Sequence, residues 1–293
     1  MKVEVECASC LLQRGYLQIK EATINPSIQF KAMSALLNLL NEDFKSNANP
    51  AVLGTQRDRL VRKITENLDP YAKRKQISNE KAMETLPLVE GLIAKENSAQ
   101  SRFRKACMCA IVGNVIEFDI PEHNFGYEDI GGLVKNAESD LAIDEISKFF
   151  DLVKKRKKLI YLADNAGEIA FDRLLVYELK KLGAPVTVAV KEGPALNDAT
   201  MEDAEYVEMD EVADNIITTG ADAVGLIPQE CSKEFLKIYN SANLVVAKGM
   251  AYAETLTEFK LNSPHVLLLR TKCNPVANYF HVGRDKNIAK IMP

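Results

Sequence analysis

Residues 158–172 read KLIYLADNAGEIAFD, and this stretch decides the fold class. It begins as a short apolar run, turns polar at Asp164 and Asn165, and resumes as a helix-like pattern after Gly167. Short apolar runs that alternate with amphipathic stretches are typical of parallel strands covered by helices on both faces. The stretch therefore predicts a strand, a polar turn at its carboxyl end and a covering helix.

The same alternation continues along the second half of the chain. Further predicted strands lie at 186–190, 205–209, 223–227, 243–247 and 265–270. Helical patterns separate them, for example at 169–183 and 228–242. The pattern indicates the α/β class, with an α/β/α doubly wound, mostly parallel sheet over residues 156–293.

The first half of the chain has helical periodicity. Apolar residues recur at three- and four-residue steps in 27–44, 79–96, 101–118 and 141–158. Strand patterns are almost absent there. We therefore predict an all-helical N-terminal domain over residues 1–155, ahead of the α/β/α domain.

Composition and charge limit the class of protein. The 293 residues carry a net charge of −4 and a sequence pI of about 5.6, and no basic stripe indicates a nucleic-acid partner. No apolar run reaches the roughly 18–20 residues that a membrane helix needs, and the first residues lack a signal-peptide pattern. We expect a cytoplasmic protein, without membrane or nucleic-acid partners, whose six cysteines are reduced.

Polar side chains follow four of the predicted strands. In an open parallel sheet, ligands bind beyond the carboxyl ends of the strands, so these side chains are expected to meet at one edge. They are Asp164, Asn165, Asn197, Asp198, Lys248 and Lys272.

The chemistry of these side chains favours a metal and a phosphate. Asp164, the Asn165 amide oxygen and Asp198 are hard oxygen ligands that suit Mg²⁺ or Mn²⁺. Lys248 and Lys272 supply positive charge for an anion. We expect a metal-activated water to attack a phosphate ester bound there.

Each feature also has a plain structural explanation. Asp-Asn before a helix often serves only as a cap, and Lys-Gly after a strand is often a solvated turn. Caps need no lysines and need not share a sheet edge, so the combination still favours a site. No G-x-G-x-x-G follows the first strand, and no G-x-x-x-x-G-K-[ST] or G-x-S-x-G occurs, which argues against a Rossmann dehydrogenase, a P-loop NTPase and an α/β-hydrolase.

Several segments resemble one known family. They are DNAGEIAFD (164–172), KEGPALNDATMEDA (191–204), VVAKGMAYAETL (245–256) and LLLRTKCNPVA (267–277), with CASC (7–10) and VGNVIEF (112–118) in the helical half. In this order they resemble the damage-control phosphatase family, long known as a domain of unknown function. The likeness covers nearly the whole chain and is greatest to the stand-alone archaeal-type branch, which carries an N-terminal C-x-x-C.

The resemblance implies a helical domain beside an α/β/α domain. It also implies hydrolysis of small phosphate monoesters, such as sugar phosphates or damaged phosphometabolites, with Mn²⁺, Ni²⁺, Co²⁺ or Mg²⁺. The family's metal ligands map onto Asp164, Asn165 and Asp198, and its phosphate-binding lysine maps onto Lys272.

The family's K-G segment maps onto Lys248 and Gly249. With Asn197 and Lys272, these two residues form the expected substrate-binding set. Relatives commonly follow the segment with Asn-Tyr, whereas Tyr252-Ala253 stand in that place here, so substrate contacts from this loop are uncertain.

Two acids on the helix after the first strand complete the expected catalytic set, together with Lys248 and Lys272. Glu168 and Asp172 lie four residues apart and share a helix face. One of them is a candidate general base, or a holder of a metal-bound water. The alternative is an ordinary helix start, where acids are favourable.

The remaining candidates are cysteines and one loop. Cys7 and Cys10 form a C-x-x-C, and with Cys107 and Cys109 they would make a Cys₄ zinc or iron–sulfur site if their helices met. Redox chemistry at the C-x-x-C is a second option, and buried thiols are the plain one. PEHNFGY (121–127), with His123, is a candidate substrate loop.

Two further hypotheses stand beside the phosphatase. The chain is alternatively a non-catalytic protein that binds a sugar phosphate or nucleotide, which needs the lysines but not the acids. It is alternatively a cysteine-centred redox or metal protein.

Overall fold

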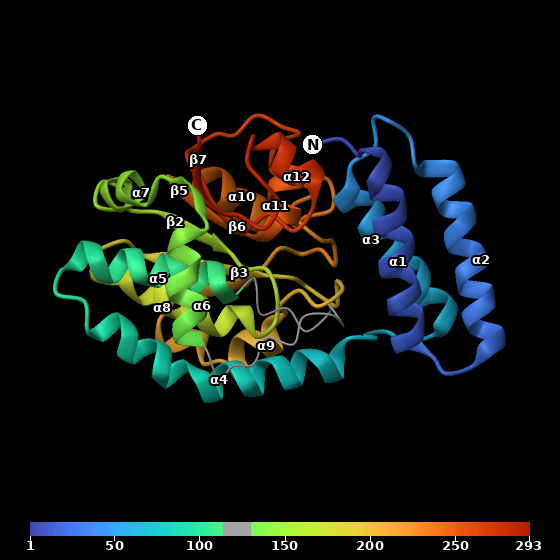
Figure 1. Cartoon of the computed structure of the whole chain (residues 1–293), viewed down its shortest axis with the longest axis horizontal. Coiled ribbons are helices and arrows are strands. Elements are labelled where there is room, and N and C mark those ends of the chain that lie inside the picture. The colour runs from blue at the N-terminus through green and yellow to red at the C-terminus, as the bar shows by residue number, and fades with distance from the viewer. Residues whose placement is uncertain (114–129) are drawn as a thin grey trace.

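A seven-stranded sheet forms the centre of the computed structural model, which describes residues 1–113 and 130–293 (Figure 1). The strand order is β1-β7-β6-β5-β2-β3-β4. All neighbouring pairs are parallel except β6 with β7. The strands are β1 (Leu141–Asp144), β2 (Leu159–Leu162), β3 (Val186–Val190), β4 (Asn215–Thr218), β5 (Leu244–Lys248), β6 (His265–Arg270) and β7 (Asn287–Met292). The predicted α/β class with a mostly parallel sheet is confirmed.

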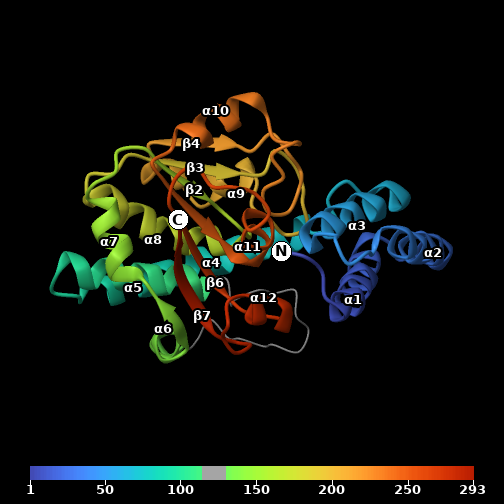
Figure 2. The same cartoon turned by 90° about the horizontal axis from the view of Figure 1, so that it is seen from above.

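Helices lie on both faces of this sheet (Figure 2). They are α4 (Ala72–Ala94), α5 (Ala99–Gly113), α6 (Ile130–Ser139), α7 (Ile146–Val153), α8 (Glu168–Lys181), α9 (Met201–Tyr206), α10 (Lys233–Ser241), α11 (Gly249–Leu256) and α12 (Asn274–Tyr279). Side chains alternate between two cores. Tyr161 of β2 packs in the core shared with α4–α9, whereas Ile160 and Leu162 pack in the core shared with α10–α12. Burial on both faces explains why the central strands are continuous apolar runs.

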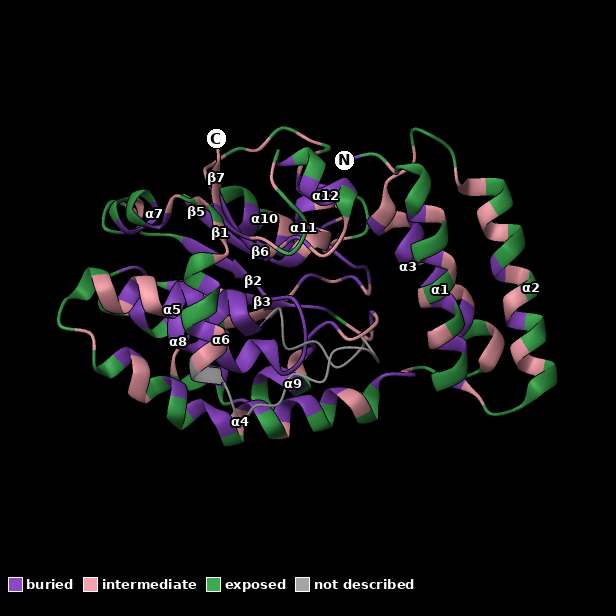
Figure 3. Ribbon diagram, viewed as in Figure 1, coloured by how far each residue is buried: buried purple, intermediate pink, exposed green. Residues whose placement is uncertain are grey.

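The first three helices form a separate lobe beside the sheet (Figure 1): α1 (Val5–Ala22), α2 (Pro26–Asp43) and α3 (Pro50–Thr65). Asn25 and Asn49 cap α2 and α3 with their side chains, and a proline follows each at the first helical position. Figure 3 shows that burial concentrates in the strands, α5 and α8, whereas α2 is largely exposed. The lobe therefore depends on its own small core and on its contacts with the rest of the chain.

Helix α3 makes those contacts. Arg59 and Arg62 each place a guanidinium nitrogen 2.6 Å from a carboxylate oxygen of Asp222. The Thr55 hydroxyl accepts a hydrogen bond of 3.1 Å from the Val224 backbone N–H. These contacts hold the lobe against the loop between β4 and α10.

The expected division at residues 155 and 156 does not follow the packing. Helices α4–α7 and strand β1 belong to the layers of the sheet, and only α1–α3 stand apart. The reason is that α4 and α5 bury apolar faces against α8, which lies on the sheet. The predicted helix at 141–158 accordingly begins with a strand, β1.

Two predicted strands are wrong. Residues 205–209 fall at the end of α9 and the start of a 3₁₀ turn, and residues 223–227 form a buried loop. Helix α5 spans 99–113 and so covers 101–113 of the helix predicted at 101–118. The candidate loop 121–127 with His123 lies outside the described residues. Within the described ranges, no helix has both the length and the apolar character needed to cross a lipid bilayer.

Candidate active site

The polar residues that follow the central strands meet where the strand order reverses, between β2 and β5. From β2 the chain runs to β3 and β4 on one side, and β5 and β6 then lie on the other side. Such a switch point leaves a crevice beyond the carboxyl ends of the two central strands. Asp164 follows β2 and Lys248 ends β5, so both come from strands beside this crevice.

Backbone pairing brings Asp198 next to the turn after β2. Asn165 and Asp198 form an antiparallel bridge. The Ala199 backbone N–H donates a hydrogen bond of 2.7 Å to the Asp164 carbonyl oxygen. Residues 34 positions apart in sequence are therefore fixed as neighbours by the main chain, independently of any ligand.

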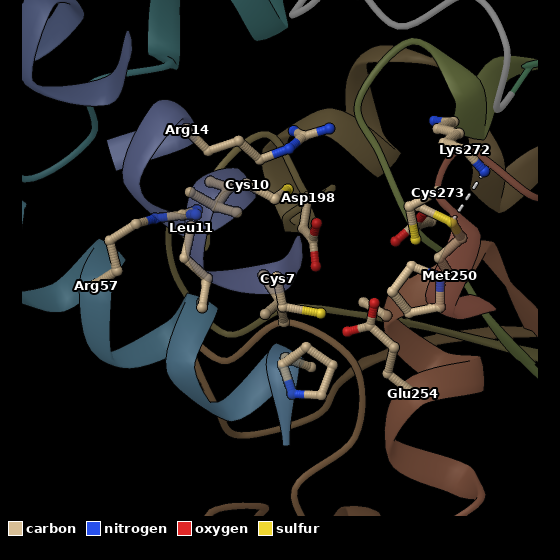
Figure 4. Close-up of a pocket in the computed structure, with 18 of the residues that line it drawn as sticks. Cys7, Cys10, Leu11, Arg14, Arg57, Asp198, Met250, Glu254, Lys272 and Cys273 are labelled. Atoms are coloured by element: carbon tan, nitrogen blue, oxygen red, sulfur yellow. Dashed lines mark hydrogen bonds between the residues drawn. The ribbon is translucent and has the colours of Figure 1, made fainter. Parts of the chain in front are cut away.

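A pocket of about 210 Å³ opens at this point, between the sheet edge and the helical lobe (Figure 4). The sheet side contributes Asp164, Asn165, Asn197, Asp198 and Lys272, and the lobe contributes Cys7, Cys10, Arg14 and Arg57. The expected convergence of acids, amides and a lysine is thus present. It includes all three predicted metal ligands, while Lys248, Gly249, Glu168 and Asp172 do not line the pocket.

Gly249 instead makes room for Asp164. Its φ is +79°, a left-handed conformation that favours glycine. A Cβ atom built there would lie 1.8 Å from Asp164 Oδ2. Gly249 therefore provides clearance, because the Asp164 carboxylate occupies the space that a side chain would take. Its substrate-binding role stays a prediction.

Lys248 lies behind the pocket and is fully buried. Its Nζ donates hydrogen bonds to Glu168 Oε1 at 2.5 Å, to Asp172 Oδ1 at 2.7 Å and to the Ala110 carbonyl at 2.8 Å. An ammonium with three acceptors and no exposed surface has no donor left for a phosphate. Lys248 is accordingly better described as the counter-ion of two buried carboxylates than as a phosphate ligand.

Glu168 holds Asn165 in a fixed orientation. The Asn165 side-chain NH₂ donates to Glu168 Oε2 at 2.8 Å and to Asp164 Oδ2 at 3.0 Å. Because the NH₂ group faces these carboxylates, the amide oxygen points away from them. Glu168 is therefore a positioning residue rather than a general base in this arrangement.

Asp172 is buried still deeper. It accepts hydrogen bonds from the Tyr161 hydroxyl and from Lys248, each at 2.7 Å. Burial raises the pKa of Asp172 to about 6 although the Lys248 ammonium opposes the shift. Because Asp172 has no exposed surface and does not line the pocket, its position does not support the expected role as general base.

Lys191, which follows β3, neutralises Asp198. Its Nζ lies 3.5 Å from Asp198 Oδ2 and donates to the Gly225 carbonyl at 2.6 Å and to the Tyr252 hydroxyl at 3.2 Å. Burial raises the pKa of Asp198 to about 7, against the effect of Lys191. Tyr252, where the family pattern departs, thus acts behind the pocket as a partner of Lys191.

The donor set fits a hard divalent cation. Within the described ranges, Asp198 Oδ2 is buried and accepts no hydrogen bond, and the Lys191 ammonium lies 3.5 Å away. The cradle at Gly249 places the Asp164 carboxylate at the same edge. Two carboxylates and an amide oxygen are the donor types that Mg²⁺ and Mn²⁺ prefer. Among the described residues, no group of three or more His, Cys, Asp or Glu side chains is arranged to hold a metal ion.

The same observation bears on the cysteines. Cys107 and Cys109 are buried inside α5, and burial raises the pKa of Cys109 to about 12. Cys7 and Cys10 lie at the pocket on α1. The two pairs do not form the Cys₄ site considered above within the part of the chain that the structure describes.

The comparisons with known proteins agree with this geometry. The model of the ARMT1-like damage-control phosphatase domain matches residues 3–288. The chain belongs to this family. The family assignment made from the sequence motifs is therefore confirmed, and a phosphatase-type function follows from it.

Full-length relatives of this damage-control phosphatase family member are archaeal. A damage-control phosphatase of Archaeoglobus fulgidus is 34% identical over 100% of both chains. An uncharacterized protein of Methanocaldococcus jannaschii is 36% identical over 98% of this chain and 95% of its own length. A crystal structure of a DUF89 family protein from Pyrococcus horikoshii superposes with a TM-score of 0.89 at 32% identity, covering 99% of this chain and 98% of that one.

Pocket residues from the lobe were missed in the sequence. Arg14 and Arg57, from α1 and α3, line the pocket but follow no predicted strand. Glu254, on the helix after β5, also lines the pocket and was not among the predicted site residues. In an amphipathic helix an arginine is ordinarily a solvated residue. Only the packing of the lobe against the sheet edge distinguishes these two.

Proposed function

We propose that this chain is a metal-dependent phosphatase that hydrolyses small phosphate monoesters, such as sugar phosphates or damaged phosphometabolites. The observation that carries the proposal is the meeting of Asp164, Asn165 and Asp198 at a pocket that Lys272 also lines. Oxygen ligands beside an ammonium group are what a phosphate ester and a divalent cation need together. Membership of a phosphatase family supports the same conclusion.

In this proposal the three oxygen ligands hold Mn²⁺, Mg²⁺, Co²⁺ or Ni²⁺. A divalent ion bound there supplies Lewis acidity toward a phosphoryl oxygen and toward water. Lys272 balances the negative charge of the phosphoryl group as it is transferred. The helix α11, which begins at Gly249, also directs its N-terminal end toward this edge.

The buried groups behind the pocket keep the ligands in place. Glu168 sets the rotation of the Asn165 amide, and Lys248 offsets part of the negative charge of Glu168 and Asp172. Lys191 does the same for Asp198. Held in this way, the ligand oxygens need little rearrangement when an ion and a substrate bind, which is the condition for effective electrostatic catalysis.

The test is phosphate release from 4-nitrophenyl phosphate with each of the four ions, with and without a chelator. Asp164→Ala and Asp198→Asn are expected to lower the rate at least about 100-fold, because a misplaced catalytic group costs about that much. Calorimetric Mn²⁺ binding to the same variants should weaken in parallel. Glu202→Gln, an exposed acid on α9, is the matched control and should behave as wild type.

Wild-type rates in Asp164→Ala, or turnover that survives the chelator, would overturn the metal assignment. Binding of phosphate esters with no turnover under any ion would instead favour the non-catalytic sugar-phosphate or nucleotide-binding protein. The cytoplasmic location remains a prediction.

A further inference from the structure

The helical lobe presents two guanidinium groups to the pocket. Arg14 comes from α1 and Arg57 from α3, and Figure 4 shows both on the side of the lobe, with Lys272 across the pocket. None of the predicted metal ligands comes from these helices. The pocket therefore has a second cationic wall, apart from the sheet edge.

Arg57 is a buried cation on the lobe side of the pocket. Its residue is 2% exposed, and within the described ranges its Nε has no hydrogen-bond partner. Among the described residues no carboxylate forms an ion pair with it. The adjacent Asp58 is committed elsewhere, since Arg62 Nε lies 2.9 Å from one of its oxygens and the Gln18 amide donates to the other at 2.6 Å.

Such an arrangement is unfavourable unless an anion completes it. A buried charge is destabilising unless an opposite charge or hydrogen-bond acceptors compensate it. Burial lowers the pKa of the Arg57 guanidinium, and the like charge of Arg14 lowers it further, although Tyr71 and the nearby Asp58 carboxylate oppose the shift. The aliphatic stem of Arg57 packs close to Gly15 of α1, where a Cβ would meet its Cδ at 3.2 Å. A methionine would fill that contact equally well, so packing alone does not require the charge.

We propose that Arg57, together with Arg14, forms a second anion subsite, and that the substrate is a phosphate monoester carrying a second acidic group, either a carboxylate or another phosphate. A planar guanidinium binds both groups through two parallel hydrogen bonds. The inference rests on the proposed function, because the reacting phosphate is assigned to the sheet side of the pocket with Lys272. The small volume of the pocket, about 210 Å³, suits a compact metabolite.

Three phosphate esters on one carbon skeleton separate the possibilities: propyl phosphate, 3-(phosphonooxy)propanoate and propane-1,3-diyl bisphosphate. For wild-type enzyme, the KM of at least one two-acid ester should be about tenfold or more below the KM of propyl phosphate. Comparing the carboxylate ester with the bisphosphate then shows which second acidic group the subsite binds. In Arg57→Met this preference should fall about tenfold or more, as expected for a lost hydrogen bond to a charged group. The loss of kcat/KM in Arg57→Met should be smallest on propyl phosphate, which carries no second acidic group.

The control is Lys63→Gln, which removes one positive charge from the exposed side of the same helix. It should leave the preference intact, so a general loss of positive potential is excluded. The thermal midpoint of Arg57→Met without substrate should be at least as high as that of wild type, because an unpaired buried charge is removed.

Three results would overturn the inference. They are equal losses on all three esters in Arg57→Met, a thermal midpoint clearly below wild type, and the absence of any wild-type preference for a second acid. If no ester is hydrolysed with any ion, the proposed function fails separately. The subsite is then judged by calorimetry with propane-1,3-diyl bisphosphate, where equal affinity of wild type and Arg57→Met would reject it and a weaker affinity of the variant would support it.

Discussion

Replacing Gly249 by alanine tests whether the position of the Asp164 carboxylate matters for catalysis. The added Cβ would start 1.8 Å from Asp164 Oδ2, whereas real Cβ atoms essentially never approach another atom closer than 3.0 Å. The carboxylate must therefore retreat by more than about 1 Å, a displacement that can cost about 100-fold in rate.

The backbone adds a second, separable effect. A non-glycine residue in the left-handed region costs roughly 1–2 kcal/mol. Gly183 has a φ of +84°, and no atom of the described residues lies within 4 Å of the place that a Cβ would take there. Gly183→Ala therefore measures the backbone cost alone, and its activity should remain that of wild type.

The assay compares both variants by urea unfolding and by metal-dependent phosphate release. We expect both to lose roughly 1–2 kcal/mol of unfolding free energy from the backbone, while only Gly249→Ala loses about 100-fold in rate. A weakened Mn²⁺ affinity in Gly249→Ala should accompany the loss. Activity within about threefold of wild type would refute the reasoning, because a displaced Asp164 would then have no effect on the chemistry.

Three further predictions concern stability. Lys248→Met should lower the unfolding free energy in urea by about 3–5 kcal/mol, since it leaves two buried carboxylates without a cation; a loss below about 1 kcal/mol would contradict the assigned counter-ion role. Burial lowers the pKa of His265, whose Nε2 lies 2.7 Å from the Tyr239 hydroxyl. The stabilising contribution of His265 is therefore present above its ordinary pKa of 6.5 and is lost as the pH falls through its folded-state pKa. On acidification, the thermal midpoint of wild type should drop more than that of His265→Gln. Parallel curves of thermal midpoint against pH would contradict this. Asn79→Ala removes the acceptor of the Gly167 backbone N–H, 2.7 Å away; a loss of about 1–3 kcal/mol in urea unfolding is expected, and an unchanged midpoint would show that water replaces the side chain.

The central strands were predictable because both their faces are buried. Strands β2, β3, β5 and β6 are nearly continuous apolar runs, because helices cover both faces of the sheet and bury the side chains on each face. The edge strand β4, by contrast, is half-exposed and reads Asn-Ile-Ile-Thr, so it lacked that signal. The wrong strand at 205–209 was predicted from a short apolar run, but Thr200 and Asp203 form a capping box that begins a helix just before it.

The sheet edge of the site was also predictable, whereas the lobe was not. Strand topology alone places Asp164 and Asp198 at one edge, because carboxyl ends of parallel strands meet there. The reach of Arg57 into the pocket depends on how α3 docks against the loop at Asp222. Helical periodicity specifies a buried face but not the partner of that face, so no pattern along the chain marks this residue.

The division of the pocket between two walls has a consequence for how such proteins diversify. Every group assigned to the reaction follows a strand of the sheet, whereas the facing arginines belong to the first 65 residues. Substitutions in that short N-terminal segment can redirect the protein to a new metabolite without disturbing the bond-breaking apparatus. Descendants of one ancestor can thus catalyse the same reaction on different substrates, and the first three helices are where such divergence should be sought.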